Sequence, residues 1–206
     1  DVRTQVNAGR WTLIGEQSVQ LHNGPLSLTG HHWAAVFQGG PRACLDGESS
    51  LIASGLTRWT SERIRVSVPR GARIRRTPTY DIRQTRRWSA DDLAPGGPPR
   101  TRVPVAAVRA GLWARTDKQA ATILTQVVQQ GLALPQDLGH ELLRITRAKR
   151  RLLLHAVVND ILDGARSLGE LDVVRELRRR GMPAPRQQQL RRDGAGRYYL
   201  DMAWPE

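Results

Sequence analysis

The first 28 residues combine a helical pattern with an alternating one. Apolar residues at helical spacing predict a short helix that ends at Gly9, a residue type common just after helices. A period-two pattern then predicts two strands joined by a turn at residues 15–17. The alternating residues are Trp11, Leu13, Val19 and Leu21. A helix followed by a short hairpin is how a winged helix-turn-helix ends, so we expect residues 1–28 to be a winged-helix remnant with a truncated recognition helix.

Residues 29–163 are predicted to hold a small sheet among helices. Two short helices are expected between residues 29 and 56, separated at Gly39-Gly40-Pro41. Alternation over residues 64–68 predicts a strand that Pro69 ends, with residues 73–80 as its expected partner. Residues 81–103 are rich in proline and glycine and are the best loop or linker candidate, in which we expect Asp91 and Asp92 to be solvated.

Three helices are predicted after this loop. The first extends from a cap at Thr116 to Gly131, the second follows Pro135, and the third ends at Gly164. Their apolar stripes are Ala120, Ile123, Leu124, Val127 and Val128; Leu138, Leu142 and Ile145; and Leu152, Leu153, Ala156, Val157 and Ile161.

Residues 164–206 form the third expected part. Ser167 and Glu170 have the spacing of a capping box, which predicts a new helix that ends before Gly181. A turn at Asp193-Gly194 then precedes a predicted strand over residues 197–204, in which Asp201 lies among apolar neighbours. A buried acid is costly without a partner, so Asp201 is expected to bind one. The predicted class is α+β.

The charge of the chain indicates a polyanionic partner. Lysine and arginine number 32 against 19 acidic residues, a formal net charge of +13, and 30 of the 32 are arginines. Arginine binds phosphates bidentately and reads guanine edges. The alternative explanation is that the gene comes from a GC-rich genome, which encodes arginine wherever any solvated cation would serve. The candidate contacts for double-stranded DNA are Arg3, Arg10, Arg63, Arg65, Arg73, Arg75 and Arg76.

Several classes of protein are excluded by what the sequence lacks. No run of 18 apolar residues is present, which excludes a membrane-spanning helix. Cys44 is the only cysteine, so the chain has no internal disulfide or multi-cysteine zinc module, as suits a cytoplasmic, nucleoid-associated protein. The sequence also contains neither a P-loop nor histidines at metal-ligand spacing.

One constellation remains for catalysis, a pair of acids some thirty residues apart. Glu170 on a helix and Asp201 on a strand could converge on Mg²⁺, which activates water against a phosphodiester. The alternative is that Glu170 only completes the capping box.

The last 43 residues resemble the opening of the very-short-patch-repair endonuclease-like family. The shared motifs are GARS-x-x-E, RR-x-G-x-P-x-P-x-x-Q and Y-x-L-D-x-x-W. This family, abundant in actinobacteria, has the PD-(D/E)xK restriction-endonuclease fold. The resemblance implies Mg²⁺ binding by Asp201 and a supporting role for Glu170. It also implies that a companion acid and base follow Glu206, so we expect the chain as given to be a truncated, inactive nuclease module.

The front of the chain is similar to a second family, the winged-helix antitoxins of abortive-infection type IV systems. The similarity lies in NAGRWTLIG, VQLHNGPLS and ERIRVSVP, with Gln17 where the family has a glycine. It implies double-stranded DNA binding, and a cognate toxin or a second copy of the chain as a further partner.

Two functions therefore remain open. The chain is either a DNA-binding protein with a Mg²⁺-dependent endonuclease module, or an antitoxin-like transcriptional regulator whose nuclease fold is not catalytic. A weaker third possibility is a structural protein whose arginines coat RNA. The expected parts are residues 1–28, 29–163 and 164–206.

Overall fold

The computed structural model describes residues 1–74, 77–181, 186–193 and 196–203, with side chains described for 1–74, 77–164 and 179–181. The chain divides into two compact units, Asp1–Val158 and Asn159–Glu206, which are described separately. Helices and three small sheets together confirm the α+β class. Within the described residues, no helix is both long enough and apolar enough to cross a membrane.

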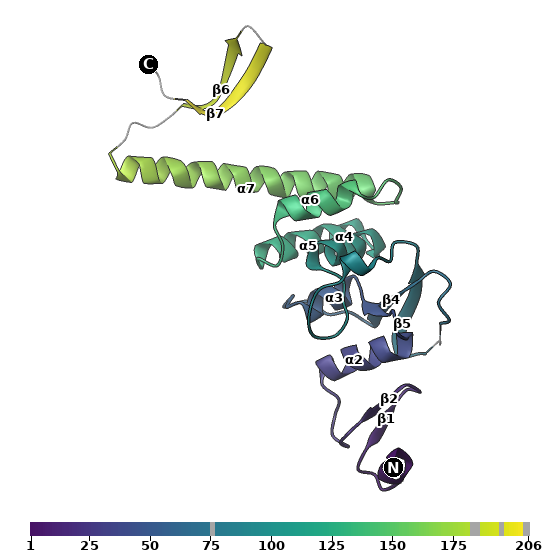
Figure 1. Cartoon of the computed structure of the whole chain (residues 1–206). Helices are drawn as coiled ribbons and strands as arrows, with labels where there is room; N and C mark the ends of the chain where they lie inside the picture. The colour runs from purple at the N-terminus through teal and green to yellow at the C-terminus, as the bar shows by residue number, and fades with distance from the viewer. Residues whose placement is uncertain (75–76, 182–185, 194–195, 204–206) are drawn as a thin grey trace. The chain divides into compact units, whose positions relative to one another are not determined.

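The N-terminal elements confirm the predicted helix and hairpin (Figure 1). Helix α1, Val2–Asn7, begins where the Asp1 carboxylate accepts a hydrogen bond from the Thr4 amide at 3.0 Å. Gly9 follows the helix with a φ of +68°, a conformation that glycine adopts without strain. Strands β1, Thr12–Ile14, and β2, Ser18–Gln20, then pair antiparallel.

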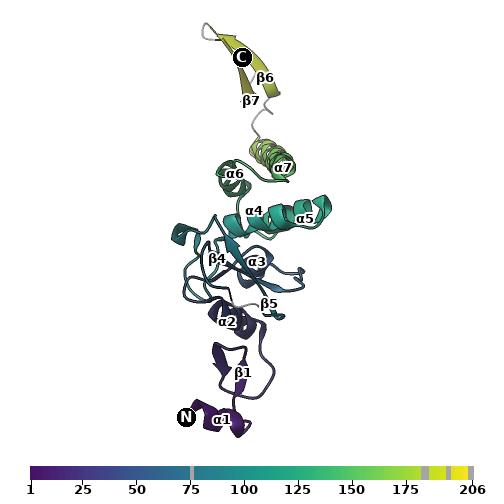
Figure 2. The ribbon, with the colours of Figure 1, turned by 90° about the vertical axis from the view of Figure 1, so that its right-hand side faces the viewer.

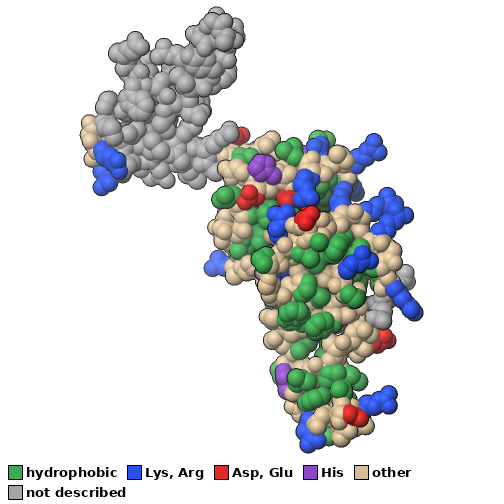
Figure 3. Space-filling model, in the orientation of Figure 1, with side chains coloured by type: hydrophobic (Ala, Val, Ile, Leu, Met, Phe, Trp, Pro, Cys, Tyr) green, Lys and Arg blue, Asp and Glu red, His purple; other side chains and the backbone are tan. Residues whose placement is uncertain are grey.

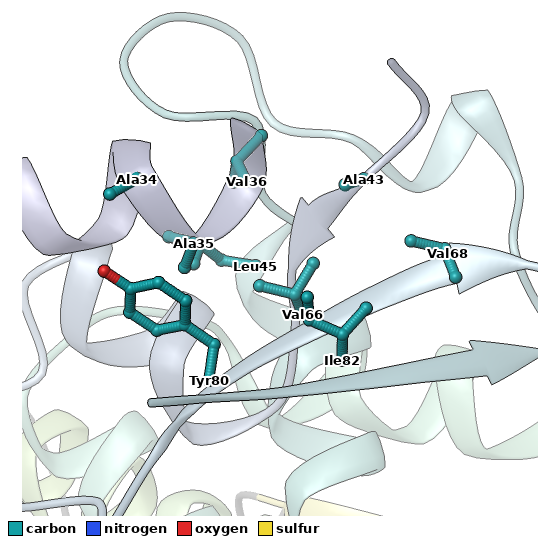
Figure 4. Packing of buried hydrophobic residues seen from close by; sticks show 9 residues of the cluster. All are labelled: Ala34, Ala35, Val36, Ala43, Leu45, Val66, Val68, Tyr80 and Ile82. Carbon is teal, nitrogen blue, oxygen red and sulfur yellow. The ribbon is translucent and has the colours of Figure 1, made fainter. Parts of the chain in front are cut away.

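A three-stranded sheet lies at the centre of the first unit. It consists of β3, Cys44–Leu45, β4, Ile64–Pro69, and β5, Tyr80–Thr85, in that spatial order. Helix α2, Leu28–Gly39, packs on the apolar face of this sheet. Figure 4 shows the contact: Ala34, Ala35 and Val36 of the helix face Val66, Val68, Tyr80 and Ile82 of the strands. The period-two pattern of β4 therefore arises because alternate residues, Val66 and Val68, face helix α2.

The predicted strand at residues 73–80 is wrong. Arg73 and Ile74 have no regular structure, and β5 starts only at Tyr80. Strand β5 is parallel to β4, so the chain must return to the other end of the sheet before β5 can begin. Residues 70–74 and 77–79 belong to that return. Two of the predicted DNA contacts, Arg75 and Arg76, lie outside the described residues.

Residues 81–103 are part of the folded unit rather than a linker. They contain the end of β5 and the short helix η1, Ala90–Asp92. Beyond η1, the Pro99 carbonyl accepts a hydrogen bond from the Leu45 amide at 2.8 Å, and the Thr101 amide donates to the Leu45 carbonyl at 3.0 Å. Proline lacks an amide hydrogen but keeps its carbonyl, so a proline-rich segment can pair along the free edge of β3.

Helix α4, Val103–Trp113, was not predicted from the sequence. Its residues Val105 to Leu112 are all buried, so it shows no polar stripe from which a helical period could be read. The helix lies on the side of the sheet opposite α2 (Figures 1 and 2). Helix α3, Glu48–Ala53, packs against α4 and β4.

The next two helices match their predictions. Helix α5, Asp117–Gln129, is capped by the Thr116 hydroxyl, which accepts a hydrogen bond from the Gln119 amide at 3.1 Å. Helix α6, Pro135–Leu143, begins at the predicted proline. Their predicted apolar stripes are buried: Ile123, Leu124, Val127, Leu138 and Leu142 have no exposed surface.

Helix α7, Arg151–Arg179, is one continuous helix, which corrects two predictions. The third helix does not end at Gly164, and the predicted capping box at Ser167 and Glu170 falls inside a helix rather than at its start. A glycine in a helix interior costs only about 1 kcal/mol. Good helix formers flank Gly164 and no proline occurs before Pro183, so the helix continues. Its predicted apolar stripe is also wrong, because Leu152 is 81% exposed whereas Leu154 and Val158 are buried.

A hairpin follows α7 in the second unit. Strand β6, Arg186–Asp193, pairs antiparallel with β7, Gly196–Ala203, with Leu190 opposite Tyr199. Strand β7 confirms the predicted strand. Strand β6 was missed because its three consecutive glutamines, residues 187–189, show no apolar alternation.

Candidate functional site: an arginine-rich sheet and its cleft

One cluster of positive charge lies around β4 and β5. Residues 58–88 contain ten arginines and two acidic residues. Seven of these arginines are exposed: Arg58, Arg63, Arg70, Arg73, Arg83, Arg86 and Arg87. Figure 3 shows basic side chains along the right-hand edge of the unit that contains these strands.

Three of these exposed arginines, together with Arg42, belong to the end of the sheet at which β4 and β5 finish. Arg70 and Arg86 directly follow the two parallel strands, and the Arg70 amide donates to the Thr85 carbonyl at 3.1 Å. Arg42 precedes β3, which is antiparallel to β4 and so begins at the same end. Arg73 lies in the connection that leaves this end. Within the described residues, none of these four guanidinium groups has a hydrogen bond or ion pair.

A cleft of about 510 Å³ lies at the opposite end of the two strands, where they begin. Its strand wall is formed by Arg63, Arg65, Asp81 and Arg83. The facing wall comes from the end of α4 and the start of α5. The residues of that wall and of the rim are Glu48, Thr60, Ser61, Glu62, Ala110, Trp113, Arg115 and Gln119.

Arg65 is the most constrained of these arginines. Its guanidinium lies 4.0 Å from the centre of the Trp113 ring, and its Nη1 donates to an Asp81 oxygen at 3.2 Å. Burial lowers the pKa of Arg65, and the Asp81 charge opposes that effect. The backbone of Gly47 covers part of the same ring, where an added Cβ would lie 3.2 Å from two ring carbons. Trp113 therefore orients Arg65.

The other arginines of the cleft differ in how their charge is compensated. Arg83 donates to the second oxygen of Asp81 at 2.6 Å, so two guanidinium groups share one carboxylate. Arg63 donates to the backbone carbonyls of Thr77 and Tyr80, which carry no net charge. Arg115 forms a bidentate pair with Glu62 at the exposed rim. The strand wall thus has three arginines for one acid.

A third group of charges is buried and was missed from the sequence. Arg109 of α4 donates to Asp46 at 2.9 Å and to Asp92 at 2.8 Å, and all three residues are buried. The prediction that Asp92 is solvated is therefore wrong, whereas Asp91 is exposed. The one available signal was Arg109 itself, a charge within an otherwise apolar segment, because such a charge needs a buried partner.

The remaining predicted site residues are not gathered at one place. Arg3 and Arg10 are exposed, and α1 and its hairpin lie on the far side of α2 from the sheet (Figures 1 and 2). They are therefore separated from Arg63 and Arg65. The backbone places Glu170 within α7 and Asp201 within β7, but the side chains of both lie outside the described residues.

No metal site is present in the part of the chain whose side chains are described, where no three His, Cys, Asp or Glu residues come together. The Mg²⁺ predicted for Asp201 concerns residues beyond that part. Comparisons of the chain with known protein families, with curated proteins and with solved structures returned no match.

Proposed function

We propose that this protein binds double-stranded DNA through the exposed arginines around β4 and β5. One observation carries the proposal: ten arginines against two acidic residues in the segment 58–88, with seven of the ten exposed. DNA affinity comes largely from contacts between such cations and phosphates. The four uncompensated guanidinium groups of Arg42, Arg70, Arg73 and Arg86 are free to make these contacts without first breaking an ion pair.

Helix α1 and its hairpin supply a second, smaller set of cations. Arg3 and Arg10 flank elements with the order of the end of a winged helix-turn-helix, which supports DNA rather than another polyanion. Phosphate contacts position a protein on DNA and do not by themselves select a sequence. We expect the arginines of the sheet to contribute affinity and the N-terminal elements to contribute any base reading.

The test is the affinity for a labelled duplex, measured by fluorescence anisotropy between 50 and 200 mM salt. Neutralising six or more phosphates predicts a loss of about 10³-fold or more across that range, because each contact releases counterions. An affinity that does not change with salt would contradict the proposal. A single-stranded RNA of equal length serves as a comparison, and tighter binding to that RNA would favour the RNA-coating alternative.

A second candidate function is Mg²⁺-dependent DNA cleavage by the C-terminal unit. The observation in its favour is that α7 is continuous through Ser167 and Glu170, which removes the capping box as the reason for that glutamate. Asp201 lies within β7, and its apolar neighbours in the sequence predict that this acid has a partner. If that partner is a metal, Asp201 would hold it; a bound Mg²⁺ supplies charge stabilisation and an activated water.

Plasmid nicking in Mg²⁺ or Mn²⁺ tests this candidate with a chain that extends past Glu206 and with the Asp201→Asn variant of that chain, because the resemblance implies a companion acid and base after Glu206. We expect the variant to lose cleavage and to retain DNA binding, because the substitution removes a metal ligand and no arginine. Glu170→Gln is expected to be milder. Cleavage that survives Asp201→Asn would contradict the assignment, and no cleavage by the folded, extended chain would favour the regulator function.

A further inference from the structure

The cleft at the start of β4 and β5 has the features of a small-molecule site. Its volume of about 510 Å³ lies within the range of ligand pockets, roughly 300–1,000 Å³. It is distinct from the arginine-bearing sheet end proposed for DNA, because parallel strands place their beginnings and ends at opposite edges. The cleft therefore needs its own explanation.

The strand wall has more positive charge than its own acid can compensate. Asp81 accepts from Arg65 through one oxygen and from Arg83 through the other, so neither guanidinium has a carboxylate to itself. Arg63 adds a third positive charge that is bound only to backbone carbonyls. An anion is the ligand that would balance this wall.

The arrangement of donors selects the kind of anion. Arg65 is fixed by the Trp113 ring and uses its Nη1 on Asp81, which leaves its Nη2 without a hydrogen-bond partner in the described part of the chain. Arg83 uses only its Nε on Asp81, and its side chain is 64% exposed, so its two Nη groups remain available. Fixed guanidinium forks suit the several oxygens of a phosphate better than a single point charge would.

The facing wall supplies polar groups for the rest of a ligand. The amide of Gln119 donates to Glu48 at 2.8 Å, and its oxygen accepts from the Arg115 amide at 2.9 Å, which holds that wall in place. The Glu48 carboxylate accepts from Gln119, and its charge acts on Arg65 without a direct ion pair, so it can also accept hydrogen bonds from hydroxyl or amino groups. The guanidinium of Arg65 already lies over the Trp113 ring, so the ligand does not need to stack on that ring.

We propose that this cleft binds a small phosphorylated molecule, with the phosphate on Arg65 and Arg83 and its hydroxyl or amino groups toward Glu48. The same phosphate chemistry could be presented by the DNA backbone, and the experiment below separates the two sources. The proposal goes beyond the DNA-binding function: of the seven exposed arginines counted for DNA, its phosphate contacts include only Arg83, and they lie at the opposite end of the sheet from the four uncompensated arginines.

The test is isothermal titration calorimetry with adenosine 5′-monophosphate, adenosine and inorganic phosphate as probes. We expect the monophosphate to bind with a Kd on the order of 10–100 µM, inorganic phosphate to bind more weakly, and adenosine not to bind. Absence of binding by both phosphate probes up to about 5 mM, or equal binding of adenosine, would overturn the proposal.

Two variants connect the binding to the cleft. Arg83→Gln removes an exposed cation and is expected to weaken monophosphate binding by about fivefold or more, because charged hydrogen bonds are lost. Arg147→Gln removes the same charge outside the cleft and should leave that Kd within about twofold. Equal effects of the two variants would overturn the proposal. So would an Arg83→Gln variant that loses duplex DNA affinity while the wild type binds no free phosphate, which would make the cleft a DNA contact.

Discussion

Arg109 is the residue whose partners are most completely buried. It joins helix α4 to the acids that follow β3 and end η1, and the side chain of Asp46 has no exposed surface. Two further hydrogen bonds satisfy that carboxylate: the Gly47 amide donates at 2.8 Å and the Thr101 hydroxyl at 3.1 Å. A buried ion pair adds little net stability, but removal of one partner leaves an unpaired charge in the interior.

We therefore expect Arg109→Met to lower the free energy of unfolding by about 3–5 kcal/mol. The matched control is Arg115→Met, which removes an arginine whose pair with Glu62 is exposed on both sides and should change stability by less than about 1 kcal/mol. Urea denaturation followed by circular dichroism measures both. An equal decrease in the free energy of unfolding of both variants would show that the buried ion pairs of Arg109 do not contribute more to stability than the exposed pair of Arg115.

Cys44 lies beside the same cluster and provides a test of its environment. Burial raises the pKa of this thiol from its ordinary 9.0 to about 12, and the negative charge of Asp46 adds to the effect. The neutral thiol is favoured in the folded state, so its contribution to stability is complete below pH 9 and is lost as the pH rises from 9 toward 12.

The corresponding expectation concerns reactivity, since only the thiolate reacts with disulfide reagents. Cys44 should not react with Ellman's reagent at pH 8 in the native protein and should react fully after unfolding in guanidinium chloride. A Cys44→Ala variant gives the background signal. Rapid labelling of the native protein would contradict the buried position.

At the scale of elements, the continuity of helix α7 makes the clearest prediction. Gly164 is inside the helix, and among the described residues no atom other than the neighbouring helix backbone lies within 4 Å of the position that a Cβ would occupy. Gly164→Ala should therefore stabilise the protein by about 0.5–1 kcal/mol, because alanine loses less backbone entropy in a helix.

The control for this substitution is Gly131→Ala, at a glycine that follows α5 with a φ of +67°. Alanine is strained in that conformation, so this variant should lose about 1 kcal/mol or more although space around the Cβ is open. Thermal unfolding followed at 222 nm measures both changes. A destabilising Gly164→Ala would indicate that the helix ends at this glycine, as the sequence pattern had suggested.

At the scale of the whole molecule, the net charge of +13 attracts the protein to polyanions. Combined replacement of Arg70, Arg73 and Arg86 by glutamine should reduce the slope of log affinity against log salt by roughly 3, since each lost phosphate contact removes about 0.9. Replacement of Arg115, which is paired with Glu62, should leave the slope unchanged within about 0.5. Anisotropy titrations on one duplex compare the two proteins, and similar slopes would place the DNA surface elsewhere.

Local chemistry was enough to predict the elements that depend on neighbouring residues. Cap residues and glycines at positive φ mark the beginnings and ends of α1 and α5, and Pro135 begins α6. The β1–β2 hairpin and strand β4 follow from alternation. The concentration of arginines between residues 58 and 88 is likewise a property of the sequence. These features were predictable because each arises from contacts or preferences within a few residues.

Tertiary structure decided the features that depend on distant partners. Strand β5 pairs parallel to β4 only after a return of the chain, and a proline-rich segment joins β3 through its carbonyls. Asp92 is buried because Arg109, seventeen residues later, supplies its countercharge. The cleft likewise exists because α4 and α5 place Trp113 and Gln119 against the polar face of the sheet. The periodicity of one segment carries no information about such pairings. The free energy of each pairing comes from contacts with a second, distant segment, whose position the first segment does not encode.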